Sequence, residues 1–175
     1  VLLRAFARFS AMQSDWRLAI MGEGPEEVRL RELASRLGIA ERVDWLGRQD
    51  SPYPFLRACR IFVLASRHEG MPNALLEAMS CALPCIVSDS SPGPLELIQD
   101  GANGLVVPVD DAEALAGAIN RLASHQSFAE ALGRQARESV KNHAPDAALK
   151  VWEEVLGLRT SPSAQASREA TQILQ

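Results

Sequence analysis

Glu69 and Glu77, eight positions apart, are the side chains of this sequence best suited to bind and act on a ligand. On one ideal helix their side chains would point about 80° apart and lie about 12 Å from each other along the axis. Pro72 suits the first position of a helix and disfavours helical backbone at Met71. We therefore expect Glu69 in a loop and Glu77 about one turn inside a helix, with both carboxylates facing one crevice.

The junction between this loop and its helix also supplies backbone donors. We expect free N–H groups at Gly70, Met71 and Asn73, at the positive end of the helix dipole, where phosphate is attracted. An anionic, hydroxyl-rich ligand such as a nucleotide-sugar suits this combination, because carboxylates accept hydrogen bonds from hydroxyl groups. The simpler alternative is an ordinary loop carboxylate at Glu69 and a solvated helix residue at Glu77.

Apolar runs separated by turn residues predict strands that alternate with helices, which is the pattern of a doubly wound parallel α/β sheet of Rossmann-like type. The run from Ile61 to Leu64 is continuously apolar, as in a strand covered on both faces. Expected strands cover residues 16–21, 43–47, 61–64, 85–87 and 104–108. Expected helices cover residues 1–12, 26–37, 72–82, 95–98, 111–123, 128–142 and 145–156, and a loop at 51–54 is expected to lead to a short helix through Cys59. Because ligands bind at the carboxyl ends of such strands, the loops at 22–25, 47–51, 66–73 and 88–94 are candidate sites.

Composition narrows the class of protein. The 175 residues are 47% hydrophobic and 23% charged, which fits one globular domain, expected over residues 1–157 with a mobile tail at 158–175. The net charge of −4 disfavours nucleic-acid binding. Residues 1–67 hold 11 arginines and 8 acidic residues, a net charge of +3, which suits either a solvated arginine-rich face or contact with phosphates or an anionic membrane. The sequence shows neither a membrane-spanning run nor a signal-peptide pattern, and its start without Met indicates a fragment.

Cysteines and glycines argue against two further kinds of site. Three cysteines make no disulfide framework and indicate a reducing compartment, and we expect Cys81 and Cys85 as small buried side chains. A redox or metal site at Cys81 and Cys85 would need more ligands than these two side chains. Gly22 and Gly24 can approach a ligand, but the G-x-G-P turn lacks the third glycine of a dinucleotide fingerprint, so NAD binding is poorly supported.

The string E-G-M-P-N-A-L-L-E-A-M at residues 69–79 resembles the E-x7-E motif of the retaining glycosyltransferase family 4. The flanking strings W-R-L-A-I-M-G-E-G-P and P-G-P-L-E-L-I-Q-D-G-A-N-G-L-V-V-P extend the resemblance over most of residues 1–157. It implies the C-terminal, nucleotide-sugar-binding half of a GT-B glycosyltransferase, truncated so that its first strand is missing. The P-G-P-L-E-L variant resembles bacterial transferases that build polysaccharide or lipopolysaccharide from UDP-sugars.

The resemblance also implies roles for individual residues. Glu69 would be the catalytic residue, acting by orientation and charge stabilisation at the donor-sugar hydroxyls, and Glu77 would hold the ribose hydroxyls. No metal or other cofactor is implied, because helix N-termini and basic side chains neutralise the diphosphate. Further donor-binding positions would be Gly22, Arg48, Gln49, Gly70, Met71, Pro72 and Asn73, with Arg48 and Gln49 against the nucleobase.

Partners and location follow from the same resemblance. It implies a polysaccharide, lipopolysaccharide or lipid-linked acceptor, an N-terminal acceptor domain absent from this chain, and a cytoplasmic location, with peripheral attachment to the inner membrane face as a further expectation. The fragment alone is then expected to be inactive. The alternatives are a nucleotide-sugar 2-epimerase and a non-catalytic nucleotide-sugar-binding module. One departure from the family is Ala82, where a helix-ending glycine is common, and a left-handed alanine there would cost about 1–2 kcal/mol.

Overall fold

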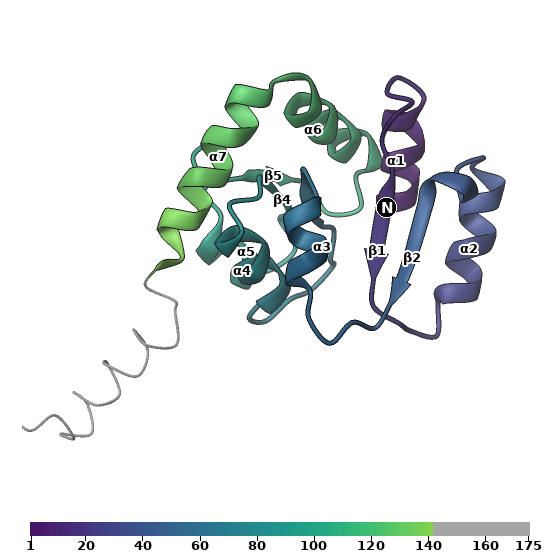
Figure 1. Cartoon of the computed structure of the whole chain (residues 1–175), viewed down its shortest axis with the longest axis horizontal. Helices are drawn as coiled ribbons and strands as arrows, with labels where there is room; N and C mark the ends of the chain where they lie inside the picture. Colours follow the sequence, from purple (N-terminus) through teal and green to yellow (C-terminus); the bar gives the residue numbers. More distant parts are fainter. Residues whose placement is uncertain (142–175) are drawn as a thin grey trace, which may run out of the picture. The chain divides into compact units, whose positions relative to one another are not determined.

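The computed structural model describes residues 1–141 and arranges them as parallel strands and helices (Figure 1). The strands are β1 (Leu18–Met21), β2 (Val43–Gly47), β3 (Phe62–Leu64), β4 (Cys85–Ser88) and β5 (Leu105–Val107). The α-helices are α1 (Leu2–Ser10), α2 (Glu27–Arg36), α3 (Tyr53–Ala58), α4 (Asn73–Ser80), α5 (Pro92–Leu97), α6 (Ala112–Ser124) and α7 (Gln126–Ser139), and residues Ala40–Arg42 form a short 3₁₀ turn. The helix expected at 145–156 and the tail expected at 158–175 lie outside the described residues.

The strands form two hydrogen-bonded ladders, and every pairing in them is parallel. β1 pairs with β2, and β3, β4 and β5 pair in that order. Parallel pairing throughout is the arrangement expected of a doubly wound sheet. The predicted α/β class with a parallel sheet is therefore confirmed.

Two apolar cores cover the faces of the three-stranded sheet. On one face, Phe9 of α1 and Leu115 of α6 pack in the same buried cluster as Ile86 of β4. On the other face, Leu75 and Met79 of α4 pack with residues of β4, α5 and α7. The alternation of side chains along β4 divides the strand between these two cores, because successive residues point to opposite faces.

Burial differs between the central strand β4 and the strands β3 and β1. All residues of β4 are buried, whereas Phe62, Val63 and Leu64 of β3 are only half-buried. The strand is covered on both faces as expected, since Val63 packs against one core and Phe62 and Leu64 pack against the other, but these residues remain partly exposed. The reason is topological, since β4 has a partner strand on each side and β3 has one on a single side only. In β1, half-buried residues alternate with exposed ones, and Met21 is 38% exposed.

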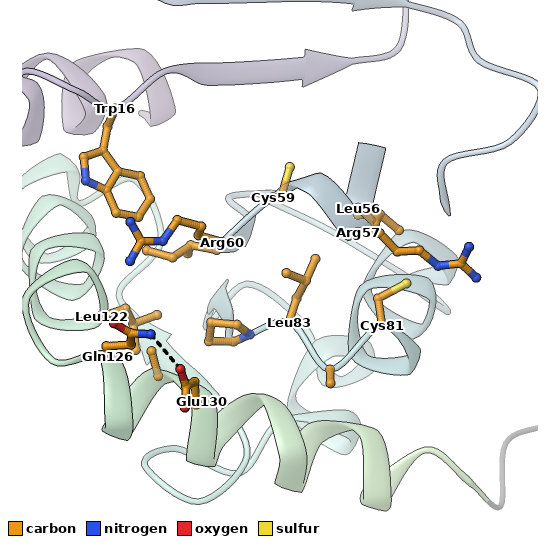
Figure 2. Close-up of a pocket in the computed structure, with 14 residues that line it drawn as sticks. Trp16, Leu56, Arg57, Cys59, Arg60, Cys81, Leu83, Leu122, Gln126 and Glu130 are labelled. Atoms are coloured by element: carbon orange, nitrogen blue, oxygen red, sulfur yellow. Dashed lines mark hydrogen bonds between the residues drawn. The ribbon is translucent and has the colours of Figure 1, made fainter. Parts of the chain in front are cut away.

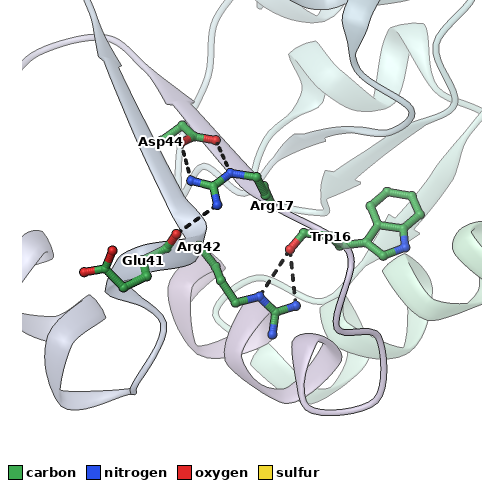
Figure 3. Close-up of polar contacts among 5 residues, drawn as sticks. All are labelled: Trp16, Arg17, Glu41, Arg42 and Asp44. Carbon is green, nitrogen blue, oxygen red and sulfur yellow. Dashed lines mark hydrogen bonds and ion pairs between the residues drawn. The ribbon is translucent and has the colours of Figure 1, made fainter.

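Two arginines connect the strands β1 and β2 and the segments that precede them through hydrogen bonds (Figure 3). The Arg17 guanidinium donates to both carboxylate oxygens of Asp44, at 2.9 and 2.6 Å, and to the Glu41 carbonyl at 2.9 Å. This hydrogen bonding with Arg17 holds the pKa of Asp44 below its usual value. Arg42 donates to the Trp16 carbonyl and also to the carbonyls of Ser10 and Gln13, which closes the turn between α1 and β1.

Helix starts differ from the sequence-based expectations at two prolines. Pro72, expected at the first helical position, is instead the N-cap residue of α4, with φ −82° and ψ 82°. The first helical residue is Asn73. Pro92 instead opens α5, three residues before the expected helical turn, because its fixed φ and missing N–H suit a first position. Of the two aspartates considered as caps for α6, Asp111 is the one used, and its carboxylate accepts from the N–H groups of Glu113 and Ala114 at 2.9 Å.

The end of α4 carries the strained backbone that the sequence suggested. Ala82 has φ 59°, in the left-handed region. Its carbonyl lies against Gly133 of α7, where an added Cβ would overlap the Ala82 oxygen. Cys85 is buried as expected, but Cys81 is only half-buried, because it lies beyond the helix end at an open hollow. Among residues 1–141, no helix has the length and apolar character needed to cross a membrane.

Candidate functional site

The segments that follow β3 and β4 lie against each other, and this contact organises the candidate site. A Cβ added at Gly93, at the start of α5, would overlap the carbonyl oxygen of Gly70 and lie 2.9 Å from its carbonyl carbon and 3.3 Å from the oxygen of Glu69. Only a glycine allows this approach of two backbones. Both segments leave the carboxyl ends of neighbouring parallel strands, which is where ligands bind in such sheets.

Glu69 is held in this contact by two serines. Ser91, which is 8% exposed, accepts from the Glu69 N–H and donates to the Glu69 carbonyl, each at 2.9 Å. Ser66 donates to the Glu69 carboxylate oxygen Oε1 at 2.6 Å. Within residues 1–141 the other carboxylate oxygen makes no hydrogen bond, so it is available to a hydroxyl group of a ligand.

The start of α4 carries the expected donors, with one correction. The Asn73 N–H is not free, because it donates to the Met71 carbonyl at 3.1 Å across the tight turn at Pro72. In the described part of the chain, the N–H groups of Gly70, Met71 and Ala74 make no hydrogen bond, so three donors remain at the helix entry. Glu77 is the fifth residue of α4 and is half-buried, one turn beyond these donors. The arrangement can bind an anion and hydroxyl groups together.

Three other predicted donor-binding residues form a second cluster after β1 and β2. Gly22, with φ 120°, donates its N–H to the Gly47 carbonyl at 2.8 Å. The Arg48 N–H donates to the Glu23 carboxylate at 3.2 Å, and the Arg48 side chain is exposed. The side-chain amide nitrogen of Gln49, Nε2, donates a hydrogen bond to the Leu46 carbonyl, so the side chain is held against its own loop.

The structure thus groups the predicted site residues into two clusters, each at the carboxyl ends of its strands. Within residues 1–141, no hydrogen bond or ion pair joins the Gly22–Arg48 cluster to the Glu69 cluster. The Glu69 cluster is instead tied to the loop after β5. Arg67 pairs with Asp110 at 2.9 Å, and the Asp89 carboxylate accepts from the Val109 N–H at 2.7 Å.

An open hollow of about 290 Å³ lies at the opposite, amino-terminal ends of the strands (Figure 2). It is lined by residues just before β3 and β4 and by α7, and the Arg60 guanidinium lies over Trp16, 4.9 Å from the ring centre. Two cysteines, Cys59 and Cys81, border it, and burial raises the pKa of the Cys59 thiol. A thiol so shifted stays protonated, and none of the predicted site residues lines this hollow.

Sequence reasoning missed the residues that hold Glu69 in place. Ser66, Ser91 and Gly93 act through contacts between separate segments, so no local pattern distinguishes them from ordinary turn residues. The signal that could have found them is topological, since Ser91 and Gly93 fall in a segment already chosen as lying at a carboxyl strand end. Among the described residues, no group of three His, Cys, Asp or Glu side chains is placed to hold a metal ion.

The sequence that forms this α/β fold and its polar loops also matches the model of a known protein family. The chain belongs to the family described as "Glycosyl transferases group 1", which matches residues 1–139. The predicted membership among GT-B glycosyltransferases is confirmed by this match and by the relatives and solved structures.

Two relatives and one solved structure show what fraction of a related full-length protein this chain covers. An exopolysaccharide phosphotransferase of Streptomyces coelicolor is 35% identical over 171 residues, which are 95% of this chain and 18% of that protein. The lipopolysaccharide core biosynthesis glycosyltransferase LpsE of Rhizobium meliloti is 37% identical over 139 residues, 79% of this chain and 39% of that protein. The crystal structure of Anabaena HepE in complex with UDP matches with a TM-score of 0.81 and 22% identity, covering 90% of this chain and 44% of that one. The chain therefore spans less than half the length of each of them.

Proposed function

We propose that this chain is the donor-binding part of a retaining glycosyltransferase that transfers a sugar from a nucleotide-sugar to a polysaccharide, lipopolysaccharide or lipid-linked acceptor. The observation that carries the proposal is the Glu69 loop, which presents a carboxylate oxygen beside the donor-rich entry of α4. A site that combines N–H donors for phosphate with carboxylates for hydroxyls suits both halves of a nucleotide-sugar.

Each half of the donor has its own contacts in this proposal. The sugar hydroxyls donate to Glu69, and the diphosphate lies along the backbone from Gly70 to Asn73, with the N–H groups of Gly70, Met71 and Ala74 as its donors. The ribose hydroxyls donate to Glu77, one turn into α4. The nucleobase lies against Arg48 and Gln49, beside the turn at Gly22.

Groups of the protein that are already in place stabilise the charges that develop on the phosphate and on the sugar during transfer. As the sugar leaves the diphosphate, negative charge grows on the phosphate oxygens, and the helix dipole and N–H groups of α4 stabilise it. Positive charge grows on the sugar, and the Glu69 carboxylate orients the sugar and stabilises that charge. The proposal needs no metal ion for these steps.

The donor base and the partners are further parts of the proposal. UDP is the first nucleotide to test, because the structurally similar HepE was solved with it. The family and the polysaccharide-related relatives support a glycan or lipid-linked acceptor, and we assign its binding to a separate N-terminal domain. We place the whole enzyme in the cytoplasm, with peripheral contact to the inner membrane face.

Calorimetric titration of the full-length protein tests the proposal. UDP, GDP and ADP are titrated first, then the corresponding nucleotide-sugars, into wild type, Glu77→Ala and Glu69→Gln. Glu77→Ala should weaken nucleoside-diphosphate binding by about 1–3 kcal/mol through lost ribose hydrogen bonds. Glu69→Gln should weaken binding of the nucleotide-sugar more than that of the nucleoside diphosphate. Absence of binding by all of these ligands to the folded wild type would contradict the proposed function.

A further inference from the structure

We propose that Ser66 and Ser91 are positioning residues for Glu69, with Ser66 orienting its carboxylate and Ser91 fixing its peptide. The inference rests on the proposed function, in which Glu69 receives the donor sugar. It concerns residues that no sequence pattern singled out, and it explains why a glutamate on a short loop can hold one orientation.

The Ser91 hydroxyl forms its hydrogen bonds with the backbone of Glu69. The two residues are 22 positions apart, yet the Ser91 hydroxyl accepts the Glu69 N–H and donates to the Glu69 carbonyl. A serine hydroxyl has one proton to donate, so Ser91 has no donor left for a ligand. Its position, 8% exposed in the loop after β4, makes it part of the scaffold behind Glu69.

Ser66 acts on the other end of the same residue. Its hydroxyl lies 2.6 Å from Glu69 Oε1, a distance typical of a charge-assisted O–H···O⁻ hydrogen bond. This bond fixes the side chain in one orientation and leaves Oε2 for the ligand. Ser66 lies two residues after β3, so a strand of the sheet sets this orientation.

The backbone contact behind Glu69 limits movement of the loop. Because Gly93 lies directly against Gly70, the Glu69 loop cannot retreat toward the segment after β4. Binding sites need their groups held by rigid neighbours, since a carboxylate that samples several orientations loses entropy when a sugar binds. The two serines and this contact together hold Glu69 at its peptide, its side chain and the following residue.

The test compares two ligands that differ only in the sugar. Full-length protein is titrated with UDP and UDP-glucose, and with GDP and GDP-mannose, in wild type, Ser66→Ala and Ser91→Ala. Ser66→Ala should weaken binding of the nucleotide-sugar by about tenfold, the equivalent of one charge-assisted hydrogen bond, and leave that of the nucleoside diphosphate within about twofold. Ser91→Ala should weaken binding of the nucleotide-sugar several-fold more than that of the nucleoside diphosphate, which also loses some affinity because the Glu69 carbonyl shares its peptide group with the Gly70 N–H. Ser66→Thr, which keeps the hydroxyl, should restore the nucleotide-sugar affinity.

Controls separate positioning from a general effect on folding. Ser35→Ala removes a comparable serine hydrogen bond, to the Arg31 carbonyl at an exposed position of α2, and should change neither affinity. Equal weakening of both ligands in the Ser66 and Ser91 variants would mean that the serines only support the fold, and would overturn the inference. Unchanged affinity for both ligands in these variants would overturn it as well.

A second readout does not depend on any ligand. Ser91→Ala should accelerate hydrogen exchange of the Glu69 amide, because that N–H loses its acceptor, while amides of α6 keep their protection. If wild type binds no nucleotide, the proposed function fails, and the sugar-positioning inference falls with it. If wild type binds and the Glu69 amide exchanges at the same rate in both proteins, the function stands and the Ser91 assignment is wrong.

Discussion

Replacing Gly93 with alanine tests the contact between the segments that form the candidate site. The added Cβ would overlap the Gly70 carbonyl oxygen and lie 2.9 Å from its carbon, whereas carbon atoms in contact are about 3.5–4.0 Å apart. One segment must therefore move by more than about 1 Å, because the overlap with the oxygen is deeper than the overlap with the carbon. Because the obstructing atoms belong to the backbone, no side-chain rotation can relieve the overlap.

The expected cost of Gly93→Ala combines two opposing terms. Forcing extra volume into a packed contact costs about 1–3 kcal/mol. Replacing glycine by alanine restricts the unfolded chain, which offsets about 0.4–1 kcal/mol of that cost. We expect a net loss of about 1–2 kcal/mol in the free energy of unfolding. Moving Glu69 by about 1 Å should also reduce glycosyl transfer by on the order of 100-fold.

Urea denaturation of the full-length protein measures the change in the free energy of unfolding. A transfer assay with saturating donor measures the change in the rate of glycosyl transfer. Gly117→Ala is the matched control, because Gly117 lies at an exposed position of α6 and no heavy atom lies within 4 Å of the place its added methyl carbon would take. That control should stabilise the protein by about 0.5–1 kcal/mol. Wild-type stability and transfer in Gly93→Ala would refute the close packing of the two segments.

Three other substitutions test the surrounding framework. Ala82→Gly should stabilise the protein by about 0.5–1 kcal/mol in urea denaturation, because relief of the left-handed strain exceeds the entropy cost of glycine, and a loss would contradict the strain. Asp111→Ala should destabilise it by about 1 kcal/mol through loss of the α6 cap, and no change would mean that the cap is unimportant. Because Arg17 lowers the pKa of Asp44, this pair stabilises the folded state above about pH 4 and loses that effect as pH falls through the folded pKa. The stability difference between wild type and Asp44→Asn should therefore shrink from about pH 7 to about pH 3, and a constant difference would argue against the pairing.

Much of the framework could be predicted from the sequence because its signals are local. Strand β2 runs from Val43 to Gly47 as predicted, since the apolar residues Val43, Trp45 and Leu46 are followed by a glycine with φ 62°. The left-handed Ala82 is suggested by the family resemblance, because a helix-ending glycine is common at this position in the family. Such features depend on neighbours in the chain, which a sequence displays directly.

The remaining features depend on contacts between distant residues. The half-burial of β3 follows from its single partner strand, and the apolar run itself carries no information about strand order. Ser91 reaches Glu69 across 22 positions, and Asn73 loses its free N–H to a turn whose geometry depends on Pro72. The motif thus predicted where the site lies, while the tertiary contacts determine how its groups are held.

Hydrogen-exchange mapping of the full-length protein with bound donor decides whether the nucleotide-sugar occupies the Glu69 loop. The amides of residues 66–74 and 88–94 are compared with and without the nucleotide-sugar that binds most tightly in the titrations. We expect protection to rise in these two segments and at the start of α4, and to stay unchanged around the hollow near Trp16 and Arg60. Protection around that hollow, with no change at Glu69 and its neighbours, would show that the donor site lies elsewhere.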